Sequence, residues 1–397
     1  MTLSQLSQAL GIENYPETLE PIYEKVKTGV KPLFSRELVD RLQEEYNLFG
    51  EYYEDVLKGL ADLEQKPNEL TWATMAALYV QGATRSEAAK VPFPTADGSP
   101  ARDMLPVFLL IPLVDRAVEE YQRRGFSREE AIGFMKVFRG DIGINVRRHG
   151  RPGLDRTYYD WITLYIFAII FPCGGFLFNI GRNKKDNYVL RNKKDSRVVI
   201  LLDQRSAHRS GYILGSAGKT DEEGAFQTSV TETQTEWIGN AVGEDCLLQR
   251  EKQHFSKEEW TLAVAPGDCA LSIHIPRNGD LSPEKVRTAV EAAFCHARTY
   301  YKEHDIKAIQ CHSWLLNPSL GEIVGPNAKV SVFGSLFRRY PVPSNGKSVF
   351  NFVFQTSVDP DIKSLPENTS LQKALKAKYL AGGCHYDFGG YILLEAE

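Results

Sequence analysis

Two histidines and a cysteine, each near the end of an apolar run, are the residues of this chain best suited to chemistry. Residues 269–276 read CALSIHIP, and residues 306–316 read IKAIQCHSWLL. If both runs are neighbouring strands, alternation brings His274 close to either Cys311 or His312. A neutral histidine there could take a proton from an attacking amine, an effect of typically about 10²–10⁴ in rate. Cys311 could instead act as a nucleophile with a histidine base.

The loop between the first run and the next helix, IPRNGDLSP at 275–283, has the features of an anion site. Ser282 is a favourable N-cap, and Pro283 suits the first helical position. The free N–H groups of the first turn and the helix dipole favour an anion, although Asp280 would repel phosphate. An ordinary strand-to-helix turn would look the same. The residues predicted to hold a phosphate are Ile275, Arg277, Gly279, Asp280, Leu281 and Ser282.

Other candidate groups are less specific. Glu232 and Glu236, in the segment TETQTEWIG, could orient an amine, but a solvated strand face fits them equally well. The Cys-His pairs at 295–296, 311–312 and 384–385 invite a zinc interpretation. Neighbouring residues on a helix point in different directions, and no CxxC or HxxxH spacing accompanies the pairs. We therefore expect no metal.

The first part of the chain is predicted to be a helical platform. Its apolar residues recur close to a 3.6-residue period, and Ser127 with Glu130 forms a capping box that opens a helix reaching Phe138. The character changes around RRHGRPGLD at 147–155, so we predict a helical domain over 1–150 and a second domain over 151–397. The helices expected before the boundary cover residues 34–63, 71–89, 103–124 and 127–138.

The second domain is predicted to be rich in strands, which gives an α+β fold of a mixed sheet flanked by helices. Short β-like runs alternate with Lys, Asp and Asn turns. Strands are expected at 176–181, 187–190, 197–202, 209–214, 269–275, 306–314, 349–355 and 391–394. Helices are expected at 158–171, at 256–265 behind a capping box of Ser256 and Glu259, after Pro283, near Leu320, and at 370–380.

Composition restricts the class of protein. Lys and Arg number 47 against 51 Asp and Glu in 397 residues, so nothing indicates an obligatory nucleic-acid partner. Six cysteines without CxxC spacing indicate reduced thiols, and the N-terminal residues lack a secretory signal, so we predict a cytoplasmic protein. The apolar stretch 161–180 approaches the length of a membrane span, but Pro172 to Gly175 break it, so a buried helix and a strand are expected.

Several motifs resemble one family along most of the chain. They are WITLYIF with FLFNIGR, ETQTEWIG, PGDCALSIHIP, CHSWLL, LPENTSLQKALKAKYLAGG and the glycine-rich end, and CHSWLL is the most specific. The C-terminal half resembles the GNAT-like domain of bacterial N-acyltransferases, and the helical half resembles their N-terminal domain. The resemblance implies acyl-CoA phosphates at the strand-to-helix loop and a thioester between splayed strands that end near His274 and Cys311.

The function that follows is transfer of an acyl group from a thioester to an amine of a small metabolite or peptide. Acyl-CoA is the expected co-substrate, and aminoacyl-tRNA or a carrier-protein thioester is the alternative donor. We expect direct attack with His274 or His312 as the base. A ping-pong acyltransferase or thioesterase that uses Cys311, and a binding protein on a decayed GNAT fold, stay as alternatives.

The chain also departs from the family pattern. The pyrophosphate signature Gln/Arg-x-x-Gly-x-Gly/Ala is absent, and only Gly279 stands in the loop. Asn183-Lys184-Lys185-Asp186 replaces the usual Leu-Gln-Phe-Glu after Gly-Arg, and Cys384 alters the Gly-Gly-His pattern. A divergent donor, a divergent acceptor or lost catalysis would each leave such changes.

Overall fold

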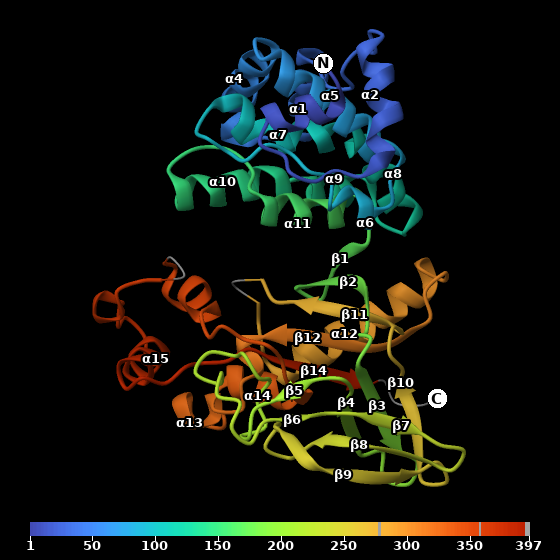
Figure 1. The fold of residues 1–397 in the computed structure, drawn as a ribbon, viewed down its shortest axis with the longest axis vertical. Coiled ribbons are helices and arrows are strands. Elements are labelled where there is room, and N and C mark those ends of the chain that lie inside the picture. Colours follow the sequence, from blue (N-terminus) through green and yellow to red (C-terminus); the bar gives the residue numbers. More distant parts are fainter. Residues whose placement is uncertain (277–278, 357–358, 394–397) are drawn as a thin grey trace. The chain divides into compact units, whose positions relative to one another are not determined.

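The computed structural model describes residues 1–276, 279–356 and 359–393 (Figure 1). Contacts divide the chain into two compact units, Met1–Phe171 and the part from Pro172 onward. Helix α11 (Arg156–Ile166), which we expected after the boundary, belongs to the first unit because its side chains are anchored there. Tyr159 Oη donates to the carbonyl of Ala88 at 3.0 Å, and the Arg85 guanidinium lies 2.7 Å from Asp160. A domain boundary near residue 150 stays a prediction.

The first unit is helical, as predicted. The capping box is present: the Ser127 hydroxyl accepts from the Glu130 N–H at 3.2 Å, and the Glu130 carboxylate accepts from the Ser127 N–H at 2.8 Å. Helices α5 (Pro67–Gly82) and α7 (Pro100–Leu110) supply much of the buried surface. The other helices before α11 are α1 (Leu3–Ala9), α2 (Glu20–Lys27), α3 (Arg36–Tyr46), α4 (Tyr53–Glu64), α6 (Arg85–Ala88), α8 (Val114–Arg123), α9 (Arg128–Met135) and α10 (Val137–His149), with 3-10 turns at Glu17–Leu19, Gly50–Tyr52 and Ile111–Leu113.

The long apolar stretch after residue 160 is divided between three elements. α11 ends at Ile166, and the hairpin strands β1 (Ile170–Cys173) and β2 (Phe176–Arg182) follow. Gly174 and Gly175 form the turn with φ of 57° and 85°, a conformation that glycine adopts without strain. Among the residues that the structure describes, no helix has both the length and the apolar character to span a bilayer.

The second unit is built on a mixed six-stranded sheet in the order β1-β2-β11-β12-β14-β13. β11 pairs parallel with β12, whereas β2 and β14 are antiparallel to their neighbours, and β11, β12 and β14 lie side by side in Figure 1. α12 connects β11 to β12 and contacts β12. The bounds are β11 (Cys269–His274), α12 (Pro283–Tyr300), β12 (Ile306–Ser313), β13 (Arg338–Pro341) and β14 (Phe388–Leu393), with α13 (Leu320–Val324), α14 (Lys329–Ser335) and α15 (Ser370–Leu380) between them.

A second sheet has the order β10-β3-β4-β8-β7, with β9 paired to β8. The prediction of a helix at 256–265 is wrong, because this segment contains the end of β9, a turn and β10. Lys193 N donates to the Glu259 carbonyl in that turn, and the buried ring of Trp260 packs at 5.1 Å from Phe255. The strands are β3 (Asn187–Asn192), β4 (Val198–Leu202), β7 (Val230–Glu232), β8 (Glu236–Val242), β9 (Leu248–Ser256) and β10 (Trp260–Val264), with the short pair β5 (Ser206–Ala207) and β6 (Phe226–Gln227) apart.

Two other expected strands differ from the structure. Residues Phe350–Phe354 form a π-helix, because Phe350 and Phe354 pack into a separate apolar cluster with Leu365 and Leu375 instead of pairing in a sheet. The segment 209–214 makes only an isolated bridge between Ala207 and Ile213. Tertiary packing overrode the β propensity of both segments. A 3-10 turn, Ile362–Ser364, follows the π-helix.

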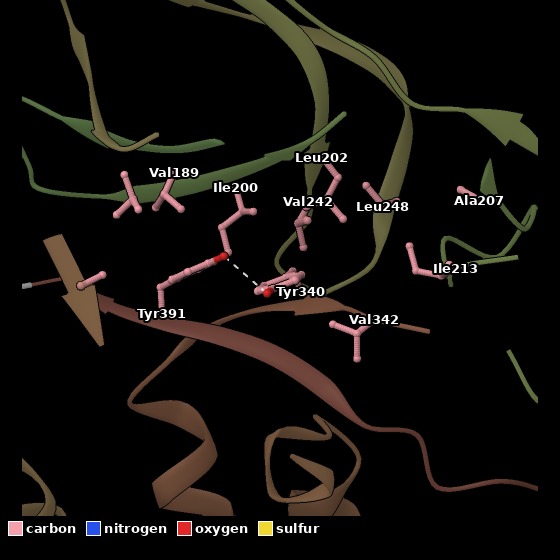
Figure 2. Packing of buried hydrophobic residues seen from close by; sticks show 12 residues of the cluster. Val189, Ile200, Leu202, Ala207, Ile213, Val242, Leu248, Tyr340, Val342 and Tyr391 are labelled. Atoms are coloured by element: carbon pink, nitrogen blue, oxygen red, sulfur yellow. Dashed lines mark hydrogen bonds between the residues drawn. The ribbon is translucent and has the colours of Figure 1, made fainter. Parts of the chain in front are cut away.

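The two sheets of the second unit share a buried cluster (Figure 2). Val189, Ile200 and Leu202 from β3 and β4 meet the stacked rings of Tyr340 and Tyr391, whose centroids lie 5.3 Å apart. Gly389 is necessary for this packing because an added Cβ would lie 2.3 Å from Cζ of Tyr340. The cluster fixes the side of the first sheet on which the second sheet packs.

Candidate active site

Strands β11 and β12 separate at their C-terminal ends. Their pairing ends at Ser272 opposite Gln310. Beyond that point β11 stays paired with β2 as far as His274, and β12 stays paired with β14 as far as Ser313. The ladder between β11 and β12 therefore ends there, and the diverging strands leave a wedge into which an extended ligand could add hydrogen bonds.

The register places both histidines on one face of the sheet. Gln310 lies opposite Ser272 and donates to its hydroxyl at 2.9 Å, so these two residues share a face. His274 and His312 each lie two residues further along the same strands and therefore project from that face. The sequence left open whether Cys311 or His312 accompanies His274, and the strand register favours His312. We call this side of the sheet, with Ser272, His274, Gln310 and His312, the polar face.

One nitrogen of His274 is committed to a structural hydrogen bond. The Asn179 amide nitrogen donates to the Ile180 carbonyl at 3.1 Å, so its oxygen is the atom that lies 2.5 Å from Nε2 of His274. Since an amide oxygen only accepts, Nε2 carries the proton and Nδ1 carries the lone pair. Burial lowers the pKa of His274 to about 4, so the imidazole is neutral at pH 7. A neutral ring with one lone pair can accept a proton, although a pKa of about 4 makes it a weaker base than an ordinary histidine.

His312 is the end of a hydrogen-bonded chain that runs into the protein. Its Nε2 lies 2.8 Å from the hydroxyl of Tyr340, and this hydroxyl lies 3.4 Å from that of Tyr391 (Figure 2 shows the contact between the tyrosines). Tyr391 donates to Asn183 at 2.5 Å and accepts from Asn187 at 2.7 Å. The His312 ring is open to solvent, yet desolvation by the surrounding chain and then the charge of Lys184 lower its pKa. Because Nε2 already has a partner, only Nδ1 of His312 is available to a substrate.

Cys311 faces the opposite side. It alternates with Gln310 and His312, is 2% exposed, and shares its face with the buried residues Ile309 and Leu271. Burial raises the pKa of its thiol to about 12. The thiolate is the nucleophilic form of cysteine, and at neutral pH almost none of it exists at such a pKa.

The predicted phosphate loop is partly organised for an anion. Ser282 occupies the N-cap position of α12 without capping the helix through its side chain, so the first-turn N–H groups are left for another acceptor. The Ser282 N–H donates to Asp280, whose carboxylate is neutralised by Lys329 at 2.9 Å. Gly279 N donates to the Pro276 carbonyl at 2.8 Å, while Ile275 is half-buried and Leu281 is buried. Arg277 lies outside the described residues.

Glu232 is not brought together with these groups. It lies on β7 of the second sheet with half of its side chain exposed, and it pairs with Lys257 at 2.6 Å. Glu236 pairs with His254 at 3.0 Å on the neighbouring strand. Across the described residues, no three His, Cys, Asp or Glu side chains gather closely enough to hold a metal ion.

Four residues of the polar face were not among the sequence candidates. Asn179 and Gln310 are polar residues at alternate positions of otherwise apolar strands, which is a signal that could have identified them. Tyr340 and Tyr391 lie far from His312 in the sequence, and no local pattern links them to it. Only the antiparallel pairing of β12, β14 and β13 brings them together.

Comparison with family models identifies the two parts of the chain. Residues 37–167 match the N-acyltransferase N-terminal domain, and residues 187–392 match the GNAT-like C-terminal domain. The chain therefore belongs to the family of N-acyltransferases that join a helical N-terminal domain to a GNAT-like domain. The protein is accordingly an acyltransferase, as the sequence motifs indicated.

Solved structures share the whole fold. An acyltransferase in complex with decanoyl-CoA and teicoplanin is 16% identical with a TM-score of 0.62, and it covers 99% of this chain and 100% of its own. An acyltransferase mutant in complex with octanoyl-CoA gives 15% identity and a TM-score of 0.63, and an acyltransferase with CoA and 10C-teicoplanin gives 16% and 0.61, both with the same coverage. No curated protein matches the chain.

Proposed function

We propose that this protein transfers an acyl group from acyl-CoA to an amine by direct attack, with His274 as the general base. The observation that carries the proposal is the divergence of β11 and β12 after Ser272 and Gln310, beside a neutral histidine with its lone pair on Nδ1. The pantetheine arm of the donor would lie in the wedge and pair with the backbone of a diverging strand. Similar folds hold decanoyl-CoA and octanoyl-CoA, which supports this donor class.

The reaction balances without a cofactor beyond the donor itself. The amine nitrogen bonds to the thioester carbonyl carbon, the C–S bond breaks, and the amine proton moves to Nδ1 of His274. The CoA thiolate takes up the proton from Nδ1 of His274 and leaves as the thiol, which returns the imidazole to its neutral form. A backbone N–H at a diverging strand end would polarise the thioester carbonyl, and the N–H groups at the start of α12 would hold the pyrophosphate.

The acceptor is a small-molecule or peptide amine. One similar structure contains teicoplanin beside decanoyl-CoA, which supports an acceptor of this kind for the fold. Asn179 is a positioning residue in this scheme, because its amide oxygen keeps the His274 proton on Nε2 and so leaves Nδ1 able to accept. His312, with Nε2 held by Tyr340, is the second candidate for the base.

The covalent alternative requires Cys311 as the nucleophile. The buried thiol lies on the face away from both histidines, and its raised pKa opposes thiolate formation, so we favour direct attack. Cys311→Ser separates the two routes: near-full turnover supports direct attack, whereas lost turnover with a trapped acyl-enzyme supports the covalent route. If the donor is an aminoacyl-tRNA or a carrier-protein thioester, the amine will be acylated with that donor and not with acyl-CoA.

Calorimetric titration of the full chain with CoA, octanoyl-CoA and decanoyl-CoA tests the proposal most directly. We expect micromolar binding of the acyl-CoAs and release of free thiol when an amine acceptor is added. No binding at millimolar ligand would overturn the acyl-CoA assignment and favour a binding protein without catalysis or another donor. Asp280→Asn serves as a loop variant, because it removes a negative charge beside the proposed pyrophosphate and should tighten CoA binding.

A further inference from the structure

A charged surface hollow in the second unit has no role in the reaction described so far. It encloses about 400 Å³ between the β2–β3 connection and the end of β4. It coincides with the segment Asn183 to Asp186, where the sequence departs from the usual Leu-Gln-Phe-Glu. The residues that line the hollow are Lys184, Lys185, Asp186, Asp203, Gln204 and Arg205.

Two charges of the hollow pair with each other, whereas neither lysine has an ion-pair partner in the described part of the chain, and Lys184 is the more buried of the two. Arg205 and Asp186 form a close ion pair with about a quarter or less of each side chain exposed. The Asp203 carboxylate accepts from the Val230 N–H at 2.9 Å. The half-buried ammonium of Lys184 has no hydrogen-bond or ion-pair partner among residues 1–276, 279–356 and 359–393. A cation removed from water without a partner is costly, so the hollow favours an anion.

The electrostatic environment of Lys184 also indicates a positive charge that is not fully compensated. Burial, followed by the charge of Arg205, lowers the pKa of Lys184, and Asp186 opposes this only in part. An anion that binds beside the ammonium would raise this pKa again. The change would be measurable by NMR titration of the lysine amine.

The hollow is connected to the polar face by one chain of contacts. Asn183, next to Lys184, accepts from the Tyr391 hydroxyl at 2.5 Å, and Tyr391 leads through Tyr340 to His312. The charge of Lys184 also acts directly on His312. A ligand in the hollow would therefore lie on the side of the polar face, from which both candidate bases project.

We propose that the hollow binds an anionic group, a carboxylate or a phosphate, carried by the amine acceptor, with Lys184 as its main partner. The inference rests on the proposed acyltransfer and specifies its substrate class. The preferred acceptors would be extended amines with a distant acid group, such as peptides, over neutral amines. Lys185, exposed at the rim, would contribute less.

The phosphates of CoA are a less suitable occupant. The hollow follows Arg182, which pairs with Cys269 at the start of β11. The proposed pyrophosphate loop follows His274 at the other end of this strand. Five residue steps at about 3.3 Å separate the two ends by roughly 17 Å, so one pyrophosphate cannot occupy both places.

The decisive experiment compares acids with their amides as acceptors. Steady-state acyltransfer from octanoyl-CoA is measured for a panel of peptides of two to six residues, each as free carboxylate and as carboxamide, so that the distance between amine and acid group spans the roughly 17 Å between the hollow and the His274 end of β11. The variants are Lys184→Met, which keeps the length without charge, Lys184→Arg, which keeps the charge, and the control Lys252→Gln, which removes an exposed charge on β9. In Lys184→Met we expect KM for the acids to rise at least about tenfold, while KM for the amides and for octanoyl-CoA changes less than about twofold.

Retention of acid preference in Lys184→Arg, and its loss only in Lys184→Met, would support the proposal. An unchanged KM for the acids in Lys184→Met would overturn it. A rise in KM for octanoyl-CoA alone would assign the hollow to the donor phosphates and would overturn it equally. Unchanged circular dichroism of the variants excludes misfolding as the cause.

A binding measurement separates this inference from the proposed reaction. Inorganic phosphate and acetate are titrated into the full chain by calorimetry and by NMR of the lysine amines. We expect millimolar binding that raises the pKa of the Lys184 amine and is absent in Lys184→Met. If no amine is acylated but this binding persists, the reaction is wrong and the anion site stands. If acylation proceeds but neither anion binds, the anion site is wrong.

Discussion

The two faces of the six-stranded sheet are built from alternate residues of the same strands, yet they have opposite chemistry. One face has His274, Gln310 and His312 near the diverging strand ends. The other has Leu271, Ile273 and Cys311, which are at most 3% exposed. The difference shows that reactive residue types alone do not define a site. A thiol one position away from a histidine lies in a packed layer, while the histidine reaches solvent.

The comparison also explains which polar groups are satisfied. On the polar face, Nε2 of each histidine has a hydrogen-bond partner, which is Asn179 for His274 and Tyr340 for His312. On the apolar face, burial removes Cys311 from water without a polar partner among the described residues, and this raises the pKa of its thiol. The predictions below test whether function and stability divide between the faces in this way.

The largest effect is expected from His274→Gln. The glutamine amide nitrogen can still donate to Asn179, so the fold is retained while the base is lost. We expect kcat/KM for the amine to fall by about 10²–10⁴, with CoA affinity unchanged by calorimetry. Activity within about threefold of the parent would transfer the role of base to His312, which His312→Gln would then confirm.

The second-largest effect is expected on stability, from a change at Gly389, which packs against Tyr340. Gly389→Ala places a Cβ against the ring of Tyr340, so one of two packed strands must shift. We expect a loss of about 1–3 kcal/mol in the free energy of unfolding, measured in urea. The control is Gly321→Ala, where the nearest heavy atom to an added Cβ is 3.9 Å away. Equal stability of both variants would contradict the packing described for Tyr340.

The two faces should also lose stability on opposite sides of neutral pH. The pKa of His274 is about 4 in the folded state and about 6.5 when unfolded, so stability falls as pH decreases through this window, by about 1–2 kcal/mol at pH 5. The pKa of Cys311 is about 12 when folded, so ionisation of the unfolded thiol costs about 1 kcal/mol by pH 10.

Urea unfolding across pH 4.5 to 10.5 measures both contributions. His274→Gln should reduce the loss on the acid side only, to which His312 and His385 also contribute, and Cys311→Ala should reduce the loss on the alkaline side only. A change of the acid side in Cys311→Ala would mean that the faces are coupled and not separate.

The smallest effect is expected from Cys311→Ala on activity. Under the proposed direct attack the thiol is part of the packed wall and takes no part in the chemistry, so kcat/KM should stay within about threefold of the parent. The variant should lose about 1 kcal/mol of stability from the small cavity that is left. The same assay that detects the His274→Gln defect provides the measurement, and a defect of comparable size would reverse the comparison of the two faces.

Local patterns predicted the elements whose signals are contained in a few neighbouring residues. The capping box at Ser127 opened a helix, and Ser282 with Pro283 began α12. The same kind of signal failed at Ser256 and Glu259, where a hairpin formed, and at 349–355, where a π-helix replaced a strand. These segments follow contacts with Phe255, Trp260 and Leu375, which no local window contains.

The sequence by itself determined the family, through motifs such as CHSWLL, and the alternation that gives each strand two different faces. It left the partner of His274 open between Cys311 and His312, because alternation assigns faces within a strand but not between strands. The parallel register of β11 and β12 puts His312 on the face of His274, and the antiparallel pairing of β12, β14 and β13 places Tyr340 and Tyr391 beside His312. A shift by one residue exchanges the two faces, so only the complete set of long-range contacts selects the site.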